Sequence, residues 1–113
     1  DDFFPGTGSL DSVGEGKGKY YSLNVPLKVG IDDDTYHEMF KTVMDEVMAK
    51  YKPGAVVLQL GAESIAYDVL GRLNLSIRGH GRCLEQMMGY NVPLMLLGGG
   101  GYTVHNVARL WAF

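Results

Sequence analysis

The stretch LMLLGGGGYTVHN, residues 94–106, runs from an apolar segment through four consecutive glycines to a tyrosine, Tyr102. Glycine loses more conformational entropy on folding than any other residue, so four in a row are costly to order. The run therefore indicates a place where bare backbone is needed beside the Tyr102 phenol. The apolar residues 94–97 predict a short strand, and the residues from about Thr103 onward predict a helix.

Segments upstream of this stretch alternate between strand and helix patterns. Residues 20–27, YYSLNVPL, and residues 55–60, AVVLQL, have the composition of strands. Between them, apolar residues at i, i+3, i+4 and i+7 predict a helix that Asp33 or Asp34 caps. The apolar stripe consists of Tyr36, Met39, Phe40, Val43, Met44, Val47, Met48 and Tyr51. A polar loop follows residue 60, and Ser76 is placed to cap a second helix that ends near residue 88.

This order predicts an α/β fold with three layers, α/β/α, and a mainly parallel sheet. In such sheets the functional groups gather beyond the carboxyl ends of the strands. Two segments occupy those ends here, GAES after residue 60 and GGGGY after residue 97. If the two strands are neighbours, Glu63 and Tyr102 lie in the same crevice.

Composition describes a globular protein of 113 residues, with 46% hydrophobic and 20% charged residues. The net charge of -3 and the absence of a Lys/Arg cluster argue against nucleic-acid binding. The apolar runs are too short to cross a membrane, and the single cysteine, Cys83, is expected to be a buried structural thiol. Because the chain starts at DDFFPG and stops at RLWAF, we expect a segment of a longer protein.

These residues are compatible with three kinds of site to different degrees. A nucleotide site is disfavoured, because neither G-x-x-x-x-G-K-[ST] nor a strand-linked G-x-G-x-x-G occurs. Tyr102 is either an oxyanion donor for acyl transfer or an ordinary half-buried tyrosine, and spacing alone does not choose between the two. Metal ligation by Glu63 would need partners, but His37 and His105 are expected to be solvated and His80 to be a hydrogen-bonded core residue. The chain therefore does not contain a complete metal site.

Several long segments, taken together, resemble the C-terminal part of the class I histone deacetylase catalytic domain. They are FFPGTG, GEGKGKYYSLNVPL, GIDDDTYHEMF, PGAVVLQLGAES, NLSIRGHGRCLE and VPLMLLGGGGYTVHNVAR, in that order and spacing. The resemblance covers residues 1–113 as a single segment. It implies the arginase-like α/β fold and a zinc-dependent amidohydrolase that acts on acetyl-lysine in histone tails and other proteins. It also implies a nuclear protein, present in the cytoplasm too, that works with corepressor subunits.

The resemblance assigns roles to individual residues. Tyr102 takes the place of the catalytic tyrosine, and Glu63 falls where the family has an aspartate zinc ligand. The resemblance places the glycines, among them Gly100 and Gly101, along the acetyl-lysine channel. It also matches Phe4 and Leu70 to apolar residues of that channel, and Tyr21 to a structural monovalent-cation site that holds K⁺.

The sequence departs from the family pattern at three places. Glu63 has a side chain one methylene longer than aspartate, and Val69 and His105 stand where the family has two arginines that help bind inositol phosphates. Neither residue offers a guanidinium fork, so the resemblance does not extend to an inositol phosphate site. The paired histidines and the Asp-x-His ligands of the family precede FFPGTG and are absent here. We therefore expect a deacetylase segment that is inactive alone; the alternative is a catalytically degenerate, deacetylase-like interaction module.

Overall fold

The computed structural model describes residues 5–113. Its longest element is α1, Asp33–Tyr51, which ends at Lys52 in a left-handed conformation (φ 52°) just before Pro53. Asp32 caps the helix by accepting the Thr35 N–H at 3.0 Å. The expected cap, Asp33 or Asp34, is thus wrong by one or two residues, because the Asp33 carboxylate instead accepts the Ser76 N–H at 2.8 Å.

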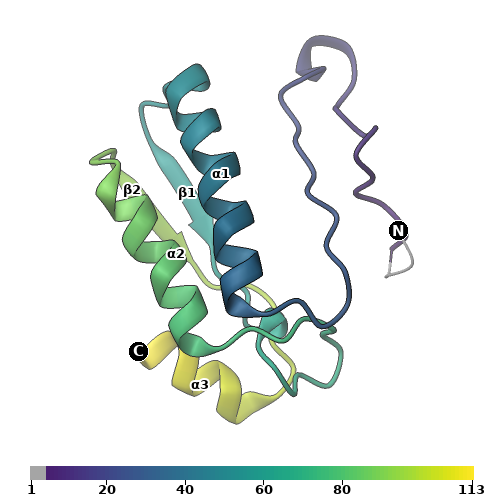
Figure 1. Ribbon diagram of the computed structural model, residues 1–113, viewed down its shortest axis with the longest axis vertical. Helices are drawn as coiled ribbons and strands as arrows, with labels where there is room; N and C mark the ends of the chain where they lie inside the picture. Colours follow the sequence, from purple (N-terminus) through teal and green to yellow (C-terminus); the bar gives the residue numbers. More distant parts are fainter. Residues whose placement is uncertain (1–4) are drawn as a thin grey trace.

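Two short strands form a parallel sheet, as the alternation of elements predicts. β1, Val56–Gln59, pairs with β2, Leu94–Leu97, so that Val56 lies opposite Leu94 and Gln59 opposite Leu97. Helix α2, Ile77–Gly89, connects them and begins at the expected cap, where the Ser76 side chain accepts the Gly79 N–H. Helices α1 and α2 pack together on one face of the sheet (Figure 1). The α/β class with parallel strands is confirmed.

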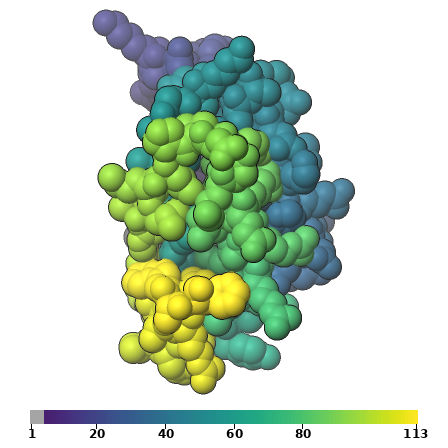
Figure 2. All heavy atoms as spheres, turned by 90° about the vertical axis from the view of Figure 1, so that its left-hand side faces the viewer, coloured from purple at the N-terminus to yellow at the C-terminus, as the bar shows by residue number. Residues whose placement is uncertain are grey.

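Helix α3, Val104–Ala112, closes the end of the molecule toward which both strands point (Figure 1). Its Trp111 indole donates a hydrogen bond to the Leu60 carbonyl at 2.9 Å, just beyond β1. Leu110 packs with Ala62 and Ile65 in a small buried cluster. In Figure 2, α3 (yellow) sits beneath the green atoms of α2 and β2. This helix therefore fixes the segments that follow the two strands.

The expected strand at residues 20–27 is wrong. These residues run as an extended segment with no strand partner, well apart from β1 and β2 (Figure 1). The apolar side chains of Leu23, Val25 and Leu27 instead line an open groove of about 340 Å³ against the apolar stripe of α1. No α1 residue is buried, since the stripe faces this groove. Strand composition favours pairing, but only a neighbouring strand can supply the hydrogen bonds.

Two single turns of 3-10 helix complete the described chain: η1, Gly16–Gly18, in the expected N-terminal loop, and η2, Ala62–Ser64, just after β1. No helix among the described residues has both the length and the apolar character needed to span a bilayer.

Candidate functional site

The segments that follow β1 and β2 continue side by side beyond the sheet. The Leu60 N–H donates to the Leu97 carbonyl at 2.9 Å, and the Ala62 N–H donates to the Gly100 carbonyl at 2.7 Å. Strand pairing thus brings η2 against the glycine run. Glu63 follows Ala62 directly, and Tyr102 lies two residues after Gly100. Both residues therefore lie at the same end of the sheet, as expected for neighbouring strands.

Glu63 projects from η2 with its carboxylate beside the bare backbone of the glycine run. A Cβ on Gly100 would lie only 2.7 Å from Glu63 Oε2. That oxygen is buried and has no hydrogen-bond partner within the described chain. A buried carboxylate oxygen without a partner is energetically costly, and a bound cation removes that cost. The structure thus fits Glu63 as one ligand of a metal ion.

The turn that carries Glu63 is held by its neighbour in the sequence. Ser64 Oγ lies 3.1 Å from the Gly61 carbonyl oxygen and 2.6 Å from His80 Nε2 on α2. His80 is buried, and this burial lowers its pKa because the charged imidazolium is poorly solvated there, although the Asp33 and Glu63 carboxylates oppose the shift. His80 is therefore the hydrogen-bonded core histidine that the sequence predicts.

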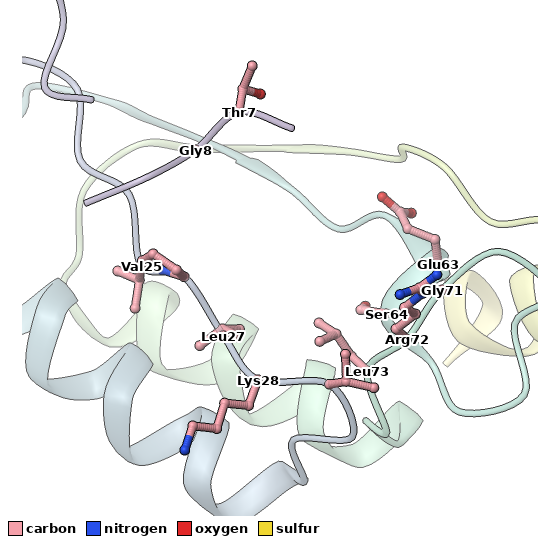
Figure 3. Close-up of a pocket in the computed structure, with 12 residues that line it drawn as sticks. Thr7, Gly8, Val25, Leu27, Lys28, Glu63, Ser64, Gly71, Arg72 and Leu73 are labelled. Atoms are coloured by element: carbon pink, nitrogen blue, oxygen red, sulfur yellow. The ribbon is translucent and has the colours of Figure 1, made fainter. Parts of the chain in front are cut away.

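An open pocket of about 650 Å³ lies on the Glu63 side of the molecule. Figure 3 shows Glu63, Gly71 and Arg72 on one side of it, across from Val25, Leu27 and Lys28 of the extended segment. Glu63 therefore contributes to the lining of an open pocket. The pocket was not foreseen from the sequence, since the extended segment was expected to be a strand of the sheet.

Close packing inside the chain explains why Gly101 must be glycine. Its φ is +138°, a conformation that other residues rarely adopt. A Cβ there would lie 2.6 Å from Val107 Cγ2 on α3 and 2.8 Å from Ala62 Cβ. Gly101 therefore lets the backbone approach η2 and α3 closely, immediately before Tyr102.

Tyr102 presents a half-exposed ring on a firmly held backbone. The side chain is 54% exposed, whereas the backbone N–H donates to Asp68 Oδ2 at 2.7 Å. Asp68 Oδ1 accepts the N–H groups of Leu70 and Gly71, both at 2.9 Å. Burial raises the pKa of Asp68, but the backbone N–H donors, those of Tyr102, Leu70 and Gly71 among them, outweigh it and lower the pKa below its ordinary value.

Sequence reasoning did not assign a role to Asp68. The sequence offered one signal: Asp68 stands two residues before Leu70 and three before Gly71, and an aspartate at this spacing is typical of Asx turns. That pattern indicates the local turn and says nothing about the bond to Tyr102, which lies 34 residues later in the chain.

Val69 and His105 stand where the family has arginines; Val69 lies next to Asp68, and His105 lies at the start of α3. Val69 is 72% exposed, and its N–H donates to Thr103 Oγ1 at 3.2 Å, while His105 is exposed on the first turn of α3. Leu70, expected at the channel rim, is 56% exposed. Val69 and His105 offer an isopropyl group and an imidazole where the family has guanidinium groups.

Two further residues were expected at the site, Tyr21 and Phe4. Tyr21 is 75% exposed, and its ring meets Tyr51 edge-on at 6.1 Å between centroids. Its assignment to a cation site stays a prediction. Phe4 lies outside the described residues.

Residues 5–113 contain no group of three or more His, Cys, Asp and Glu side chains arranged to hold a metal ion. A metal ion bound at Glu63 would therefore need further ligands from outside residues 5–113. Cys83 is 4% exposed, and burial raises its pKa to about 11, which makes it the inert, buried thiol expected from the sequence.

Comparison with known proteins gives a consistent result over the whole chain. The histone deacetylase domain model matches residues 1–113. The chain is 60% identical over 112 residues to Histone deacetylase 19 of Arabidopsis thaliana and 55% identical to Type-1 histone deacetylase 1 of Dictyostelium discoideum. It is 54% identical to Probable histone deacetylase 1-B of Xenopus laevis. Each match includes 99% of this chain but only 22% to 23% of the relative.

Proposed function

Because the chain belongs to the histone deacetylase family, we propose that it forms the C-terminal portion of a deacetylase catalytic domain and that the full-length protein hydrolyses acetyl-lysine. The substrates would be histone tails or other acetylated proteins, in the nucleus and within corepressor complexes, with a cytoplasmic pool as well. The observation that carries the proposal is the pairing of β1 and β2, which brings Glu63 and the segment of Tyr102 to one end of the sheet.

Tyr102 supplies the oxyanion donor in this proposal. Its phenol O–H donates one hydrogen bond, which suits the carbonyl oxygen of an acetyl group as negative charge develops there. Leu70 and the bare backbone at Gly100 and Gly101 would border the aliphatic stem of the lysine. Removal of a single oxyanion donor typically costs about 100- to 1,000-fold in turnover.

Glu63 would contribute one ligand to a zinc ion, because its buried Oε2 lacks another partner. When bound, zinc polarises the acetyl carbonyl and lowers the pKa of a coordinated water. The remaining ligands and the general base would come from residues outside this segment. We therefore expect isolated residues 1–113 with added zinc to be inactive toward an acetyl-lysine peptide, and measurable zinc-dependent turnover would contradict this.

The test uses the full-length protein and an acetyl-lysine peptide. Tyr102→Phe removes only the hydroxyl, so kcat is expected to fall about 100-fold or more while the fold is kept. Tyr90→Phe is the matched control, since the Tyr90 hydroxyl donates to Asp45 on α1 and Tyr90 precedes β2, whereas Tyr102 follows its carboxyl end. Turnover by Tyr102→Phe equal to that of Tyr90→Phe would refute the role of the phenol.

A second candidate function rests on Glu63 itself. If the longer side chain displaces the metal, the protein is a deacetylase fold that acts as an interaction module. Zinc content and turnover of the full-length protein, compared with its Glu63→Asp variant, separate the two. Turnover by the natural protein supports the enzyme, whereas zinc binding and turnover by the aspartate variant alone support the module.

K⁺ at Tyr21 stays part of the proposal as a structural ion. An inositol phosphate site is not proposed, because Val69 and His105 replace the arginines that would hold it.

A further inference from the structure

The loop at residues 67–71 holds the backbone on both sides of the Tyr102 side chain. Asp68 Oδ2 accepts the Tyr102 N–H at 2.7 Å, and the next residue, Thr103, donates its hydroxyl to the Tyr67 carbonyl at 3.1 Å. The Thr103 hydroxyl oxygen also accepts the Val69 N–H at 3.2 Å. Three hydrogen bonds therefore join this loop to two consecutive residues that lie more than thirty positions away in the chain.

Asp68 is anchored in its own loop before it reaches Tyr102. Its Oδ1 is occupied by the N–H groups of Leu70 and Gly71, and the side chain is only 8% exposed. A buried carboxylate that is fixed at one oxygen holds its other oxygen in a defined place. Oδ2 lies against the Tyr102 N–H, and the Thr103 backbone also stabilises the Asp68 carboxylate.

The loop also pays a conformational cost to reach this arrangement. Tyr67, which is 94% exposed, has φ 68°, in the left-handed region that disfavours residues with a side chain. Backbone strain of this kind persists only where surrounding contacts impose it. The bonds of Tyr67, Asp68 and Val69 to residues 102 and 103 are such contacts.

We propose that Asp68 is a positioning residue for Tyr102: through the hydrogen bond to the Tyr102 N–H, it sets where the phenol stands over the site. The inference rests on the proposed deacetylase function. Tyr102 is 54% exposed, so packing covers only part of the ring, and the hydrogen bond to Asp68 fixes the backbone from which the ring extends. A displacement of about 1 Å at a catalytic group can lower turnover by about 100-fold.

The decisive variant is Asp68→Asn in the full-length protein. The asparagine carbonyl oxygen can still accept the Leu70 and Gly71 N–H groups, but its NH₂ group then faces the Tyr102 N–H, donor against donor. The local turn is kept while the bond to Tyr102 is lost. Asn106→Ala is the matched control, because the Asn106 side chain donates to the Ala66 carbonyl at 3.2 Å, so the variant removes a hydrogen bond between α3 and the residue before this loop and leaves the Asp68–Tyr102 bond in place.

Two readouts are measured on both variants. With an acetyl-lysine peptide, Asp68→Asn is expected to lower kcat about 10- to 100-fold and to change KM less than twofold, whereas Asn106→Ala keeps kcat within about twofold. Hydrogen exchange of backbone amides is expected to show faster exchange at Tyr102 in Asp68→Asn, with Leu70 and Gly71 still protected. A kcat that stays unchanged, or that falls equally in both variants, overturns the inference.

The second readout separates this inference from the proposed function. If the natural full-length protein shows no turnover with zinc, the proposed function fails, and the positioning role in deacetylation fails with it. Hydrogen exchange then still reports on the Asp68–Tyr102 bond itself. Unchanged Tyr102 protection in Asp68→Asn would overturn the inference even in an active enzyme, because the bond would not depend on the carboxylate.

Discussion

Substitution of Gly101 by alanine tests the close packing behind Tyr102. The new Cβ would meet Val107 Cγ2 at 2.6 Å and Ala62 Cβ at 2.8 Å, and it would sit on a backbone with φ +138°. Ala62 is fully buried, and its Cβ cannot move without moving the backbone of η2. Overpacking typically costs about 1–3 kcal/mol, and an unfavourable backbone conformation about 1–3 kcal/mol more. We therefore expect Gly101→Ala to lower the free energy of unfolding by about 2–6 kcal/mol.

Urea denaturation of the full-length protein, followed by circular dichroism, measures this loss. The matched control is Gly54→Ala in the turn after α1, where an added Cβ meets nothing within 4 Å. That variant is expected to stay within about 0.5 kcal/mol of the natural protein. If Gly101→Ala unfolds at the same urea concentration as Gly54→Ala, the packing of η2, Gly101 and α3 described above is wrong.

Three further predictions concern single side chains. Tyr67→Gly should raise the free energy of unfolding by about 0.5–1 kcal/mol, because the relief of left-handed backbone strain exceeds the cost of the added entropy of the unfolded chain. Tyr67→Phe keeps a side chain at this position and, in the same urea titration, should leave the free energy of unfolding unchanged. Native Cys83, with its pKa of about 11, should react with iodoacetamide at pH 8 at least about 100-fold more slowly than in denaturant, and equal rates would contradict its burial. Burial lowers the pKa of His80 in the folded state, so the contribution of the neutral imidazole to stability is complete above the unfolded pKa of about 6.5 and is lost as pH falls through the folded pKa. His80→Gln should therefore flatten this part of the curve of unfolding free energy against pH. An unchanged slope would assign the pH dependence to other groups.

Local patterns in the sequence were sufficient for most of the elements. The apolar stripe of α1, the Ser76 cap of α2 and the apolar runs of β1 and β2 are all confirmed, because each depends on residues within a few positions of one another. The parallel pairing followed from the alternation of strands and helices, and with it the placement of Glu63 and the glycine run at one end of the sheet.

Partners distant in the chain were decided only by the tertiary structure. Residues 20–27 have the composition of a strand, but a strand needs a neighbouring backbone, which the described chain does not place there. Asp33 looked like a helix cap, yet its carboxylate accepts the Ser76 N–H 43 residues away and leaves the cap to Asp32. Asp68 holds Tyr102 across 34 residues for the same reason: a hydrogen bond needs two groups in one place, and only the folded chain brings them there.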